Sequence, residues 1–414
     1  MSDQLLTKRR YKDGDDKHRP WTEEIFTADE SNKCPTYVHR APPCQGSCPA
    51  GEDIRGWLNI VRGIEKPPAG SPWQEYAFSR VAQANPFPAI MGRVCPAPCE
   101  DGCNRNEVED YVGINSVEQF IGDYALQHKL KLPEAGKDTG KKVAIIGSGV
   151  AGLTVAYQLR LLGHGCTVFE AHPKLGGMAR YGIPDYRIPR EVLDGEIQRI
   201  LDMGVEVRTK TKVGVDISIE QLRTEFDVIY IGIGAQSGSA IPIPGGDAPN
   251  VISGVSFLEA YNQGRLLHSA KKVLVIGGGD TAMDVAAVAR RIGHIEKVRE
   301  HDHPENVILG HTVHDVATAA NRQGADVTIV YRRPIAKMPA TKMEITHVTN
   351  EGVDIRHSLA PLEVVIGEDG RAKALRVIEA DWSTGKFVAI EGSESEIECD
   401  LIVPAIGQTG DLTG

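Results

Sequence analysis

The sequence predicts an α/β fold in which two Rossmann-like domains, one inserted into the other, follow an α-helical domain. Three observations predict this arrangement. Six of the eight cysteines lie within residues 34–103, among short helical patterns. Two glycine-rich loops follow, each between an apolar strand and a helical stretch. A strand pattern like the one that leaves the first glycine-loop unit then recurs near residue 400.

Composition limits the class of protein. The 414 residues are 41% apolar and 25% charged, which suits several domains with real cores. The net charge of −10 disfavours nucleic acid as the main partner, because phosphate binding needs a basic face. No apolar run approaches the roughly 18 residues of a membrane helix, and the polar first residues do not read as a signal peptide. We therefore expect a cytoplasmic protein with no membrane span.

The clustered cysteines predict a metal centre. Structural disulfides are rare in a reducing compartment, so grouped thiols there more often bind metal or do chemistry. Prolines directly after cysteines, as in Cys48-Pro49 and Cys95-Pro96, favour iron–sulfur clusters. Zinc and disulfides remain the alternatives. Six thiols exceed the four ligands of one cluster and are two fewer than the eight ligands of two clusters. The six are Cys34, Cys44, Cys48, Cys95, Cys99 and Cys103.

A second cluster would need ligands other than cysteine. Glu118 is the main candidate, since it lies fifteen residues after Cys103 in a helix-like stretch. His39 is a weaker one. Cys166 and Cys399 stand in strand-like surroundings, where a thiol behaves as a small apolar group, so we expect them to be structural.

The first glycine loop lies between a buried strand at 143–146 and a helix at 153–162. In this context Gly147 permits a tight turn, Gly149 lets a pyrophosphate approach the backbone, and Gly152 lets helix and strand pack closely. The helix N-terminus then faces the phosphates with its partial positive charge. The whole motif reads Gly147-Ser148-Gly149-Val150-Ala151-Gly152.

The residues after this loop predict FAD as its nucleotide. A second strand, 166–170, ends in Glu170, eighteen residues after Gly152, where a carboxylate can accept hydrogen bonds from ribose hydroxyls. The pair Gly176-Gly177, followed by Met178, is typical of FAD-binding proteins, in which the chain passes close to the cofactor.

The second glycine loop predicts a pyridine nucleotide. It lies between a strand and a helix at 282–292, and its motif is Gly277-Gly278-Gly279-Asp280-Thr281-Ala282. The next strand, 327–330, ends in Tyr331, Arg332 and Arg333. Arginines there suit a 2′-phosphate, which favours NADPH and leaves NADH open. The histidine-rich stretch between helix and strand is irregularly spaced for a metal site, so we expect a solvated insertion near 293–324 with a helix at 312–322.

These features predict four segments. Residues 1–138 form a helical domain, with helices at 54–62 and 116–132, and a polar linker at 133–140 ends it. Residues 139–254 begin the FAD domain, which the chain leaves through a strand ending at Gly234 and Ala235. Residues 255–395 form the NAD(P)H domain. Residues 396–414, including Gly407, return to the FAD domain, which stays incomplete within this sequence.

The motifs together resemble the small (beta) subunit of glutamate synthase and its relatives, including the N-terminal part of dihydropyrimidine dehydrogenase. The resemblance covers nearly the whole chain, and the motifs that carry it are Gly92-Arg93-Val94-Cys95-Pro96 with Cys99 and Cys103, both glycine loops, Gly176-Gly177, Tyr181-Gly182-Ile183-Pro184 with Arg187, Tyr331-Arg332-Arg333 with Met338-Pro339, and Ala405-Ile406-Gly407-Gln408.

The resemblance implies FAD on the first loop, NAD(P)H on the second and two [4Fe–4S] clusters in the helical domain. By position, one cluster would be held by Cys48, Cys95, Cys99 and Glu118. The other would be held by Cys44 and Cys103 with Cys34. The sequence departs from the family here, because Cys34 alone stands where a close Cys-x-x-Cys is the pattern, and His39 aligns with the second thiol. The family also continues past residue 414 with a strand that touches FAD.

The predicted function is an NAD(P)H:acceptor oxidoreductase. Hydride passes from NAD(P)H to FAD, and single electrons pass through the clusters to or from a partner protein. The stretch Pro35-Thr36-Tyr37-Val38-His39 is more similar to the flavoprotein of dissimilatory sulfur metabolism that works with sulfite reductase, and the alternative is the small subunit of NADPH-dependent glutamate synthase. A homo-oligomer is compatible with either.

Two other classes of function are disfavoured. A disulfide reductase acting alone needs a redox Cys-x-x-Cys near the flavin, and neither Cys166 nor Cys399 has such a partner. A non-enzymatic assembly subunit would not need intact glycines at both loops. No Ser-His-Asp set or paired carboxylates with a catalytic role are predicted, since the cofactors supply the chemistry.

Overall fold

The computed structural model describes residues 42–109, 112–294, 303–308 and 324–410. The chain divides into two compact units, Met1–Pro133 and Glu134–Gly414, and the division falls within the segment 133–140 predicted as a linker. Three of the predicted features, Cys34, His39 and the helix at 312–322, lie outside the described residues.

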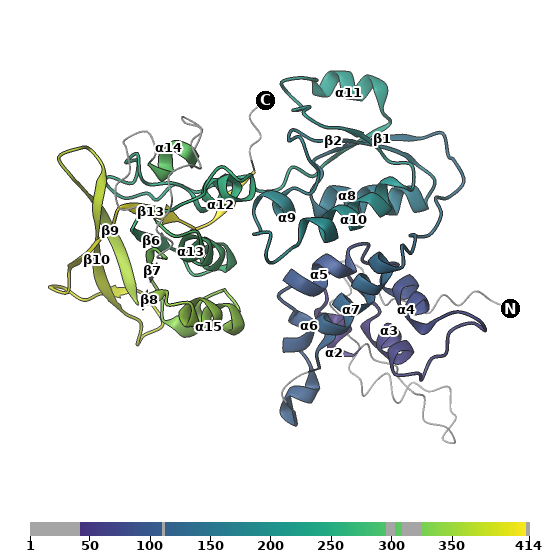
Figure 1. Cartoon of the computed structure of the whole chain (residues 1–414), viewed down its shortest axis with the longest axis horizontal. Helices are drawn as coiled ribbons and strands as arrows, with labels where there is room; N and C mark the ends of the chain where they lie inside the picture. Colours follow the sequence, from purple (N-terminus) through teal and green to yellow (C-terminus); the bar gives the residue numbers. More distant parts are fainter. Residues whose placement is uncertain (1–41, 110–111, 295–302, 309–323, 411–414) are drawn as a thin grey trace, which may run out of the picture. The chain divides into compact units, whose positions relative to one another are not determined.

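The first unit is helical where it is described (Figure 1). Asp53 caps a helix by accepting a hydrogen bond from the amide of Gly56. The long helix predicted to reach residue 132 ends earlier, because Lys129 takes a left-handed backbone conformation at φ 52°. The elements are α2 (Pro43–Ser47), α3 (Ile54–Val61), α4 (Trp73–Val81), α5 (Pro88–Val94), α6 (Pro98–Asp101), the 3₁₀ helix η1 (Asn104–Glu107) and α7 (Ile114–Gln127).

Two glycines let helices α5 and α7 lie against each other. A Cβ on Gly122 of α7 would stand 2.2 Å from the amide nitrogen of Ala89 in α5. A Cβ on Gly92 of α5 would stand 2.5 Å from the amide nitrogen of Gln119 in α7. The close approach places the end of α5, where the cysteine loop begins, beside the face of α7 that carries Glu118.

The second unit begins with a four-stranded parallel sheet in the order β3-β2-β1-β4. Alternate residues of β1 point to opposite faces: Ala144 and Ile146 join a core with Leu222 of α11, while Ile145 faces Gly152 of α8. Helices α8 and α10 therefore cover one face and α11 the other (Figure 1). The elements are β1 (Lys142–Ile146), α8 (Val150–Leu161), β2 (Gly165–Phe169), α9 (Met178–Tyr181), α10 (Arg190–Leu201), β3 (Glu206–Arg208), α11 (Ile219–Glu225) and β4 (Val228–Ile231).

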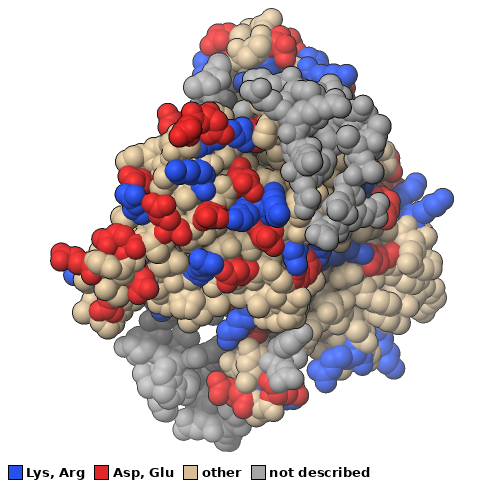
Figure 2. Space-filling model, turned by 60° about the vertical axis from the view of Figure 1, so that its left-hand side comes forward, with Lys and Arg blue, Asp and Glu red and all other residues tan. Residues whose placement is uncertain are grey.

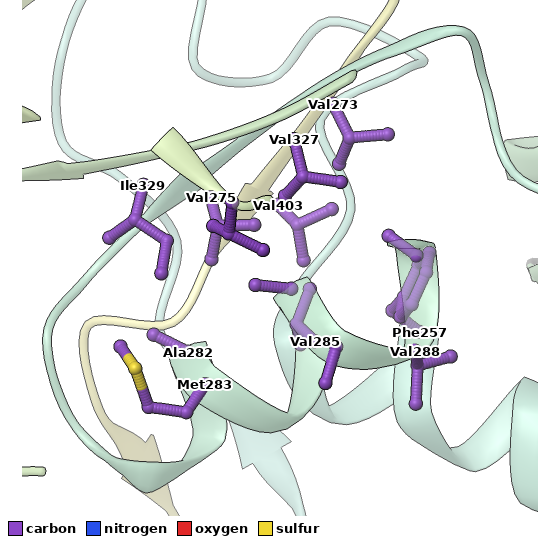
Figure 3. Close-up of a cluster of buried hydrophobic side chains, with 14 of the residues drawn as sticks. Phe257, Val273, Val275, Ala282, Met283, Val285, Val288, Val327, Ile329 and Val403 are labelled. Carbon is purple, nitrogen blue, oxygen red and sulfur yellow. The ribbon is translucent and has the colours of Figure 1, made fainter. Parts of the chain in front are cut away.

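A second parallel sheet follows in the order β13-β6-β7-β8. Val273 and Val275 of β6 pack into a core with helices α12 and α13, as Figure 3 shows. Leu274 and Ile276 point the other way and pack on an antiparallel sheet. The elements are β5 (Ser237–Gly238), α12 (Gly254–Asn262), β6 (Lys272–Ile276), α13 (Asp280–Ile292), α14 (Pro304–Ile308), β7 (Asp326–Tyr331), η3 (Ile335–Lys337), α15 (Lys342–Asn350) and β8 (Asp354–His357).

The antiparallel sheet covers the free face of the second parallel sheet. Its strands are β9 (Leu359–Ile366), β10 (Ala372–Asp381), β11 (Val388–Ala389) and β12 (Ser395–Glu398), with β10 paired to the other three. After it, β13 (Leu401–Pro404) enters the second parallel sheet, and β14 (Gln408–Thr409) pairs with β5.

This course corrects the predicted return at residue 396. Strand β13 pairs with β6 of the second sheet in parallel register, so the chain leaves that sheet only after Pro404. The carboxylate of Asp400 accepts a hydrogen bond from the amide of Lys272 at 2.9 Å and fixes this register. A short apolar strand suits either parallel sheet, and the sequence pattern alone does not name its partner.

The predicted solvated insertion is also corrected in part. Within residues 293–324, helix α14 is described, and its Val307 and Ile308 are buried, with Ile308 in the core of the second sheet. His294 is buried as well and forms a β-bridge with Ser269. This part of the insertion belongs to the domain core.

The described surface mixes charges of both signs. Figure 2 shows Lys and Arg side chains interspersed with Asp and Glu on the visible face. Within the described ranges, no helix has the length and apolar character needed to cross a bilayer.

Candidate cofactor sites

The first glycine loop has the geometry of a phosphate-binding turn. Gly147 has φ 100°, and a Cβ there would stand 2.4 Å from the carbonyl oxygen of Gly232. A Cβ on Gly152 would stand 2.0 Å from the carbonyl oxygen of Gly147. Gly149 is different, because the nearest atom to its Cβ position is the Cα of Gly177, 3.9 Å away. Two glycines are therefore required for packing, and the third, the N-cap of α8, leaves space beside the helix N-terminus.

Glu170 stands at the end of β2 and is buried against the first glycine loop. One carboxylate oxygen accepts hydrogen bonds from the amide, at 3.0 Å, and the hydroxyl of Ser148. The other accepts from the amide of His172 at 2.8 Å. The second oxygen accepts only one hydrogen bond from the described residues and has a further lone pair for a ribose hydroxyl, so the same carboxylate can orient the loop and bind a nucleotide.

The Gly176-Gly177 pair is brought to the same loop. The amide of Gly176 donates to the carbonyl of Ser148 at 3.1 Å. Gly177, at φ 50°, has its Cβ position 2.7 Å from the Cα of Gly149, and Met178 then begins α9. Gly234 lies near the last described residue, because a Cβ on Gly410 would stand 3.0 Å from the carbonyl oxygen of Gly234.

The other residues predicted to bind FAD lie in the first turn of α8, after β4 and directly before β14. Ala151 lies in the first turn of α8, and Ala235 follows Gly234 after β4. Gly407, at φ 137°, accepts a hydrogen bond from the amide of Ser239 at 3.0 Å. Ala151 and Ala235 therefore lie at the carboxyl edge of the first sheet, where nucleotides bind in parallel α/β folds.

The second glycine loop repeats the design. A Cβ on Gly277 would stand 2.3 Å from the carbonyl oxygen of Ala405, and one on Gly278 would stand 2.7 Å from the ring of Tyr331. The Cβ position of Gly279 has no atom within 4 Å. Ala282 is fully buried, and the hydroxyl of Thr281 accepts from the amide side chain of Gln408 at 3.3 Å. The open position again lies at a helix N-terminus, that of α13.

Arg332 and Arg333 follow directly after Tyr331, whose ring packs on Gly278. Both arginines are exposed. Neither guanidinium has an ion pair with any residue in the described part of the chain. Two positive charges without an ion-pair partner among the described residues therefore lie next to the second glycine loop.

Arg187, predicted as a cofactor-binding residue, joins the two dinucleotide domains. Its guanidinium lies 2.8 Å from Asp284 in α13 and 2.6 Å from Glu344 in α15. Burial raises the pKa of Asp284 to about 6 despite the arginine. Burial, followed by the Glu344 carboxyl, also raises the pKa of Asp280 to about 6. Asp284 and Glu344 could not be predicted as partners, since they lie 97 and 157 residues from Arg187 in the sequence.

The cysteine loops in the first unit place five described thiols on helix ends. Cys44 lies in α2 and Cys99 in α6; Cys48, Cys95 and Cys103 lie at helix caps. All five are free thiols. No three Cys, His, Asp or Glu groups within the described residues are arranged to hold a single metal ion.

The cysteine thiols and the Glu118 carboxyl lie close enough to shift the pKa values of the thiols. Burial raises the pKa of Cys99 to about 12, and the charges of Cys95 and Cys48 add to the effect. Burial also raises the pKa of Cys95, with Glu118 the next charge. The pKa of Cys44 is raised by burial and by Cys103. Thiols crowded in this way ionise readily only beside a cationic centre, so the donor set fits iron–sulfur clusters.

Glu118 is buried in α7 and is held by residues that the sequence did not single out. The side-chain amide of Asn85 donates to its carboxylate at 2.6 Å, and Asn85 is in turn fixed by the amide of Phe87 at 2.9 Å. Burial raises the pKa of Glu52, which hydrogen-bonds to Asn85 and Glu118. Asn85 and Glu52 carry no motif, and only the fold brings them to Glu118.

Each of the two units matches the model of a known protein family. Residues 141–414 match the family model of pyridine nucleotide-disulphide oxidoreductases. Residues 10–130 match the model of dihydropyrimidine dehydrogenase domain II, with a 4Fe-4S cluster.

Curated relatives extend over most of the chain. The NADPH-Fe(3+) oxidoreductase subunit beta of Geobacter sulfurreducens is 34% identical over 92% of this chain and 53% of that protein. The NADP(+)-dependent formate dehydrogenase subunit beta of Moorella thermoacetica is 32% identical over 90% and 51%. The glutamate synthase [NADPH] small chain of Mycobacterium tuberculosis is 34% identical over 89% and 72%. The chain therefore spans about half the length of the first two relatives.

Solved structures share the fold of about two thirds of the chain. FprA of Mycobacterium tuberculosis in complex with NADPH gives a TM-score of 0.52 at 19% identity, over 66% of this chain and 72% of that one. The predicted fold class is confirmed by the two sheets and these matches. The resemblance to the glutamate synthase small subunit family is confirmed, as are the predicted cofactor types, flavin with NAD(P)H and [4Fe–4S]. The individual site residues remain predictions.

Proposed function

Because the chain belongs to the pyridine nucleotide-disulphide oxidoreductase family, we propose that it passes electrons between NADPH and a partner redox protein through FAD and two [4Fe–4S] clusters. The observation that carries this proposal is the contrast between the two glycine-loop units. In the first dinucleotide domain, buried Glu170 follows strand β2. In the second dinucleotide domain, exposed Arg332 and Arg333 follow strand β7. A carboxylate suits ribose hydroxyls, and arginines suit a 2′-phosphate.

In the first dinucleotide domain, the chain's residues bind and orient the flavin nucleotide. The open side of Gly149 admits the pyrophosphate to the N-terminus of α8. Glu170 accepts from the ribose while Ser148 holds its orientation. Gly176 and Gly177 keep the following segment close to the loop without side chains in the way.

In the second dinucleotide domain, Gly279 leaves the N-terminus of α13 open for the pyrophosphate of NADPH. Arg332 and Arg333 receive the 2′-phosphate beside Gly278. Arg187 connects this domain to the first one through Asp284 and Glu344, which limits how the two nucleotides can be oriented.

In the first unit, the proposed ligand sets follow the groups of thiols. Cys48, Cys95 and Cys99 share one neighbourhood with Glu118 and would hold one cluster. Cys44 and Cys103 influence each other and would hold the second cluster with Cys34. FAD held by the first dinucleotide domain would supply the exchange between a hydride and single electrons, and clusters held by the thiols would supply single-electron transfer.

The electron partner is proposed to be another protein of the cytoplasm. Two of the relatives are named as beta subunits of larger enzymes, which supports transfer between subunits. Glutamate synthase is a second candidate, because the relative of that name is 34% identical and this chain covers 72% of it. Sulfite reductase is the partner suggested by the resemblance at Pro35–His39, and the three partner types differ in which isolated protein the reduced chain can reduce.

The test is anaerobic purification followed by iron and flavin analysis and titration with NADPH or NADH. We expect flavin and iron in the same protein, bleaching of the flavin absorbance by NADPH, and weaker binding of NADH. A protein that contains flavin without iron, or that neither nucleotide reduces, would contradict the proposal. Co-purification with the intact protein would then name the partner.

A further inference from the structure

The segment that carries Arg332 and Arg333 is held by an indole from a distant strand turn. The Nε1–H of Trp382, which follows β10, donates to the carbonyl oxygen of Arg332 at 2.9 Å. The guanidinium carbon of Arg333 lies 6.0 Å from the centre of the Trp382 ring. One side chain therefore contacts both arginines, the backbone of the first and the charged group of the second.

The turn that presents Trp382 is itself well ordered by hydrogen bonds. Asp381 accepts from both the amide and the hydroxyl of Ser383 at 2.8 Å. The amide of Gly385 donates to the carbonyl of Trp382 at 2.9 Å. Phe387 packs edge-on against the indole with ring centres 6.1 Å apart. The indole is thus fixed from its own side before it reaches Arg332.

A second anchor acts on the same arginine segment. The amide of Ser358, which has φ 57°, donates to the carbonyl of Arg333 at 3.0 Å, and its carbonyl accepts from Ala380 of β10 at 2.8 Å. Tyr331 closes the other end, since its hydroxyl donates to the carbonyl of Lys337 at 2.7 Å. The backbone of Arg332 and Arg333 is therefore fixed at both residues, while their side chains stay exposed.

We propose that Trp382 is a specificity-determining residue that positions Arg332 and Arg333 for the 2′-phosphate of NADPH. The inference rests on the proposed function, in which those arginines bind that phosphate. The indole has no described contact with the glycine loop and contacts only the two arginines of the nucleotide site. It should therefore act through the arginines and affect only nucleotides that carry a 2′-phosphate. Removing it should lower NADPH affinity without changing NADH affinity.

The experiment measures binding of 2′,5′-ADP and 5′-AMP to the anaerobically purified, cofactor-loaded protein by calorimetry, with NADPH and NADH kinetics alongside. Trp382→Phe keeps an aromatic ring but removes the Nε1–H donor to the carbonyl oxygen of Arg332. We expect roughly three- to tenfold weaker 2′,5′-ADP binding, from the usual strength of one hydrogen bond. Trp382→Leu also removes the ring and should weaken binding further. KM for NADPH should rise with kcat unchanged, and both 5′-AMP binding and KM for NADH should stay within about twofold of wild type.

Val388→Ala is the control, because this exposed apolar side chain lies on the same hairpin and has no described contact with Trp382, Arg332 or Arg333. It should bind 2′,5′-ADP like the wild type. Arg332→Ala and Arg333→Ala test the proposed function itself. If an arginine variant weakens 2′,5′-ADP binding and neither Trp382 variant does, the role of Trp382 is refuted and the arginine site stands. If no arginine variant weakens 2′,5′-ADP binding, the proposed arginine site and the proposed role of Trp382 are both wrong. If a Trp382 variant weakens 5′-AMP and 2′,5′-ADP equally, the indole serves stability alone and the proposal is wrong.

Discussion

The guanidinium of Arg187 lies 2.8 Å from the carboxylate of Asp284, although the two residues belong to different dinucleotide domains. The same guanidinium reaches Glu344 at 2.6 Å. Asp284 is 7% exposed, so its charge depends mainly on Arg187 for compensation, with Arg291 a smaller contribution. The contact makes the junction between the domains an electrostatic one, built around one arginine.

Removing this arginine should therefore destabilise the second unit. Arg187→Met keeps much of the side-chain volume and leaves Asp284 buried without its cation, and we expect a loss of about 2–3 kcal/mol in the free energy of unfolding. The measurement is a denaturant titration near neutral pH. Lys141→Met is the control, because it breaks the exposed Lys141–Asp227 pair and should leave the unfolding midpoint unchanged. Equal midpoints for the two variants would show that Arg187 has no such role.

The same site predicts how stability depends on pH. Burial raises the pKa of Asp284 to about 6, above its ordinary value of 3.8, so the folded state holds the proton more tightly than the unfolded state. Its contribution to stability is full below about pH 4 and is lost as pH rises through about 6. Between pH 4.5 and 7 this amounts to about 2 kcal/mol for the aspartate alone.

Asp284→Asn removes the titrating group and retains a hydrogen-bond acceptor for Arg187. The difference in unfolding free energy between wild type and variant should shift in favour of the variant by about 2 kcal/mol from pH 4.5 to 7. Comparing the two proteins at each pH cancels acid effects that both share. A difference that stays constant over this range would mean that Asp284 does not titrate there.

The second and third glycines of the first loop, Gly149 and Gly152, should affect different properties of the protein when changed to alanine. In Gly152→Ala, the new Cβ meets the carbonyl oxygen of Gly147 at 2.0 Å, so we expect a loss of at least about 2 kcal/mol in stability. In Gly149→Ala the nearest atom is 3.9 Å away and φ is −67°, so the protein should keep its stability. The added methyl should still block the pyrophosphate, and most of the flavin should be lost. Unfolding midpoints of flavin-free protein and flavin content distinguish the two; a flavin-loaded Gly149→Ala protein would contradict the proposed site.

The glycine loops could be predicted from the sequence because their requirements are local. Gly147, Gly152 and Gly277 are needed for backbone angles and close approaches within one strand–turn–helix unit, so their spacing carries the information. The helices start earlier than predicted, at Val150 and Asp280, because Gly149 and Gly279 act as N-caps with extended backbones.

Contacts over long sequence separations could not be predicted in this way. Asp284, Asn85 and Trp382 lie in ordinary helical or turn sequence, and their partners are 97, 33 and 50 residues away. Strand β13 was assigned to the wrong sheet for the same reason, since a short apolar run does not encode its neighbour. In each case the missing information is the packing of the whole domain.

The contact between Asn85 and Glu118 gives a last prediction, about iron. If Glu118 completes one of two clusters, Glu118→Ala should lower the iron content per chain toward half of the wild-type value while flavin content stays the same. Asn85→Leu has a similar volume and no amide donor, so it leaves the Glu118 carboxylate without its 2.6 Å hydrogen bond and should give an intermediate loss. Glu109→Ala is the control, because this glutamate is exposed and pairs only with Arg105 among the described residues. Iron and flavin are measured on protein purified without oxygen. Full iron in Glu118→Ala would remove this residue from the ligand set, and full iron in Asn85→Leu with a loss in Glu118→Ala would show that the carboxylate keeps its position unaided.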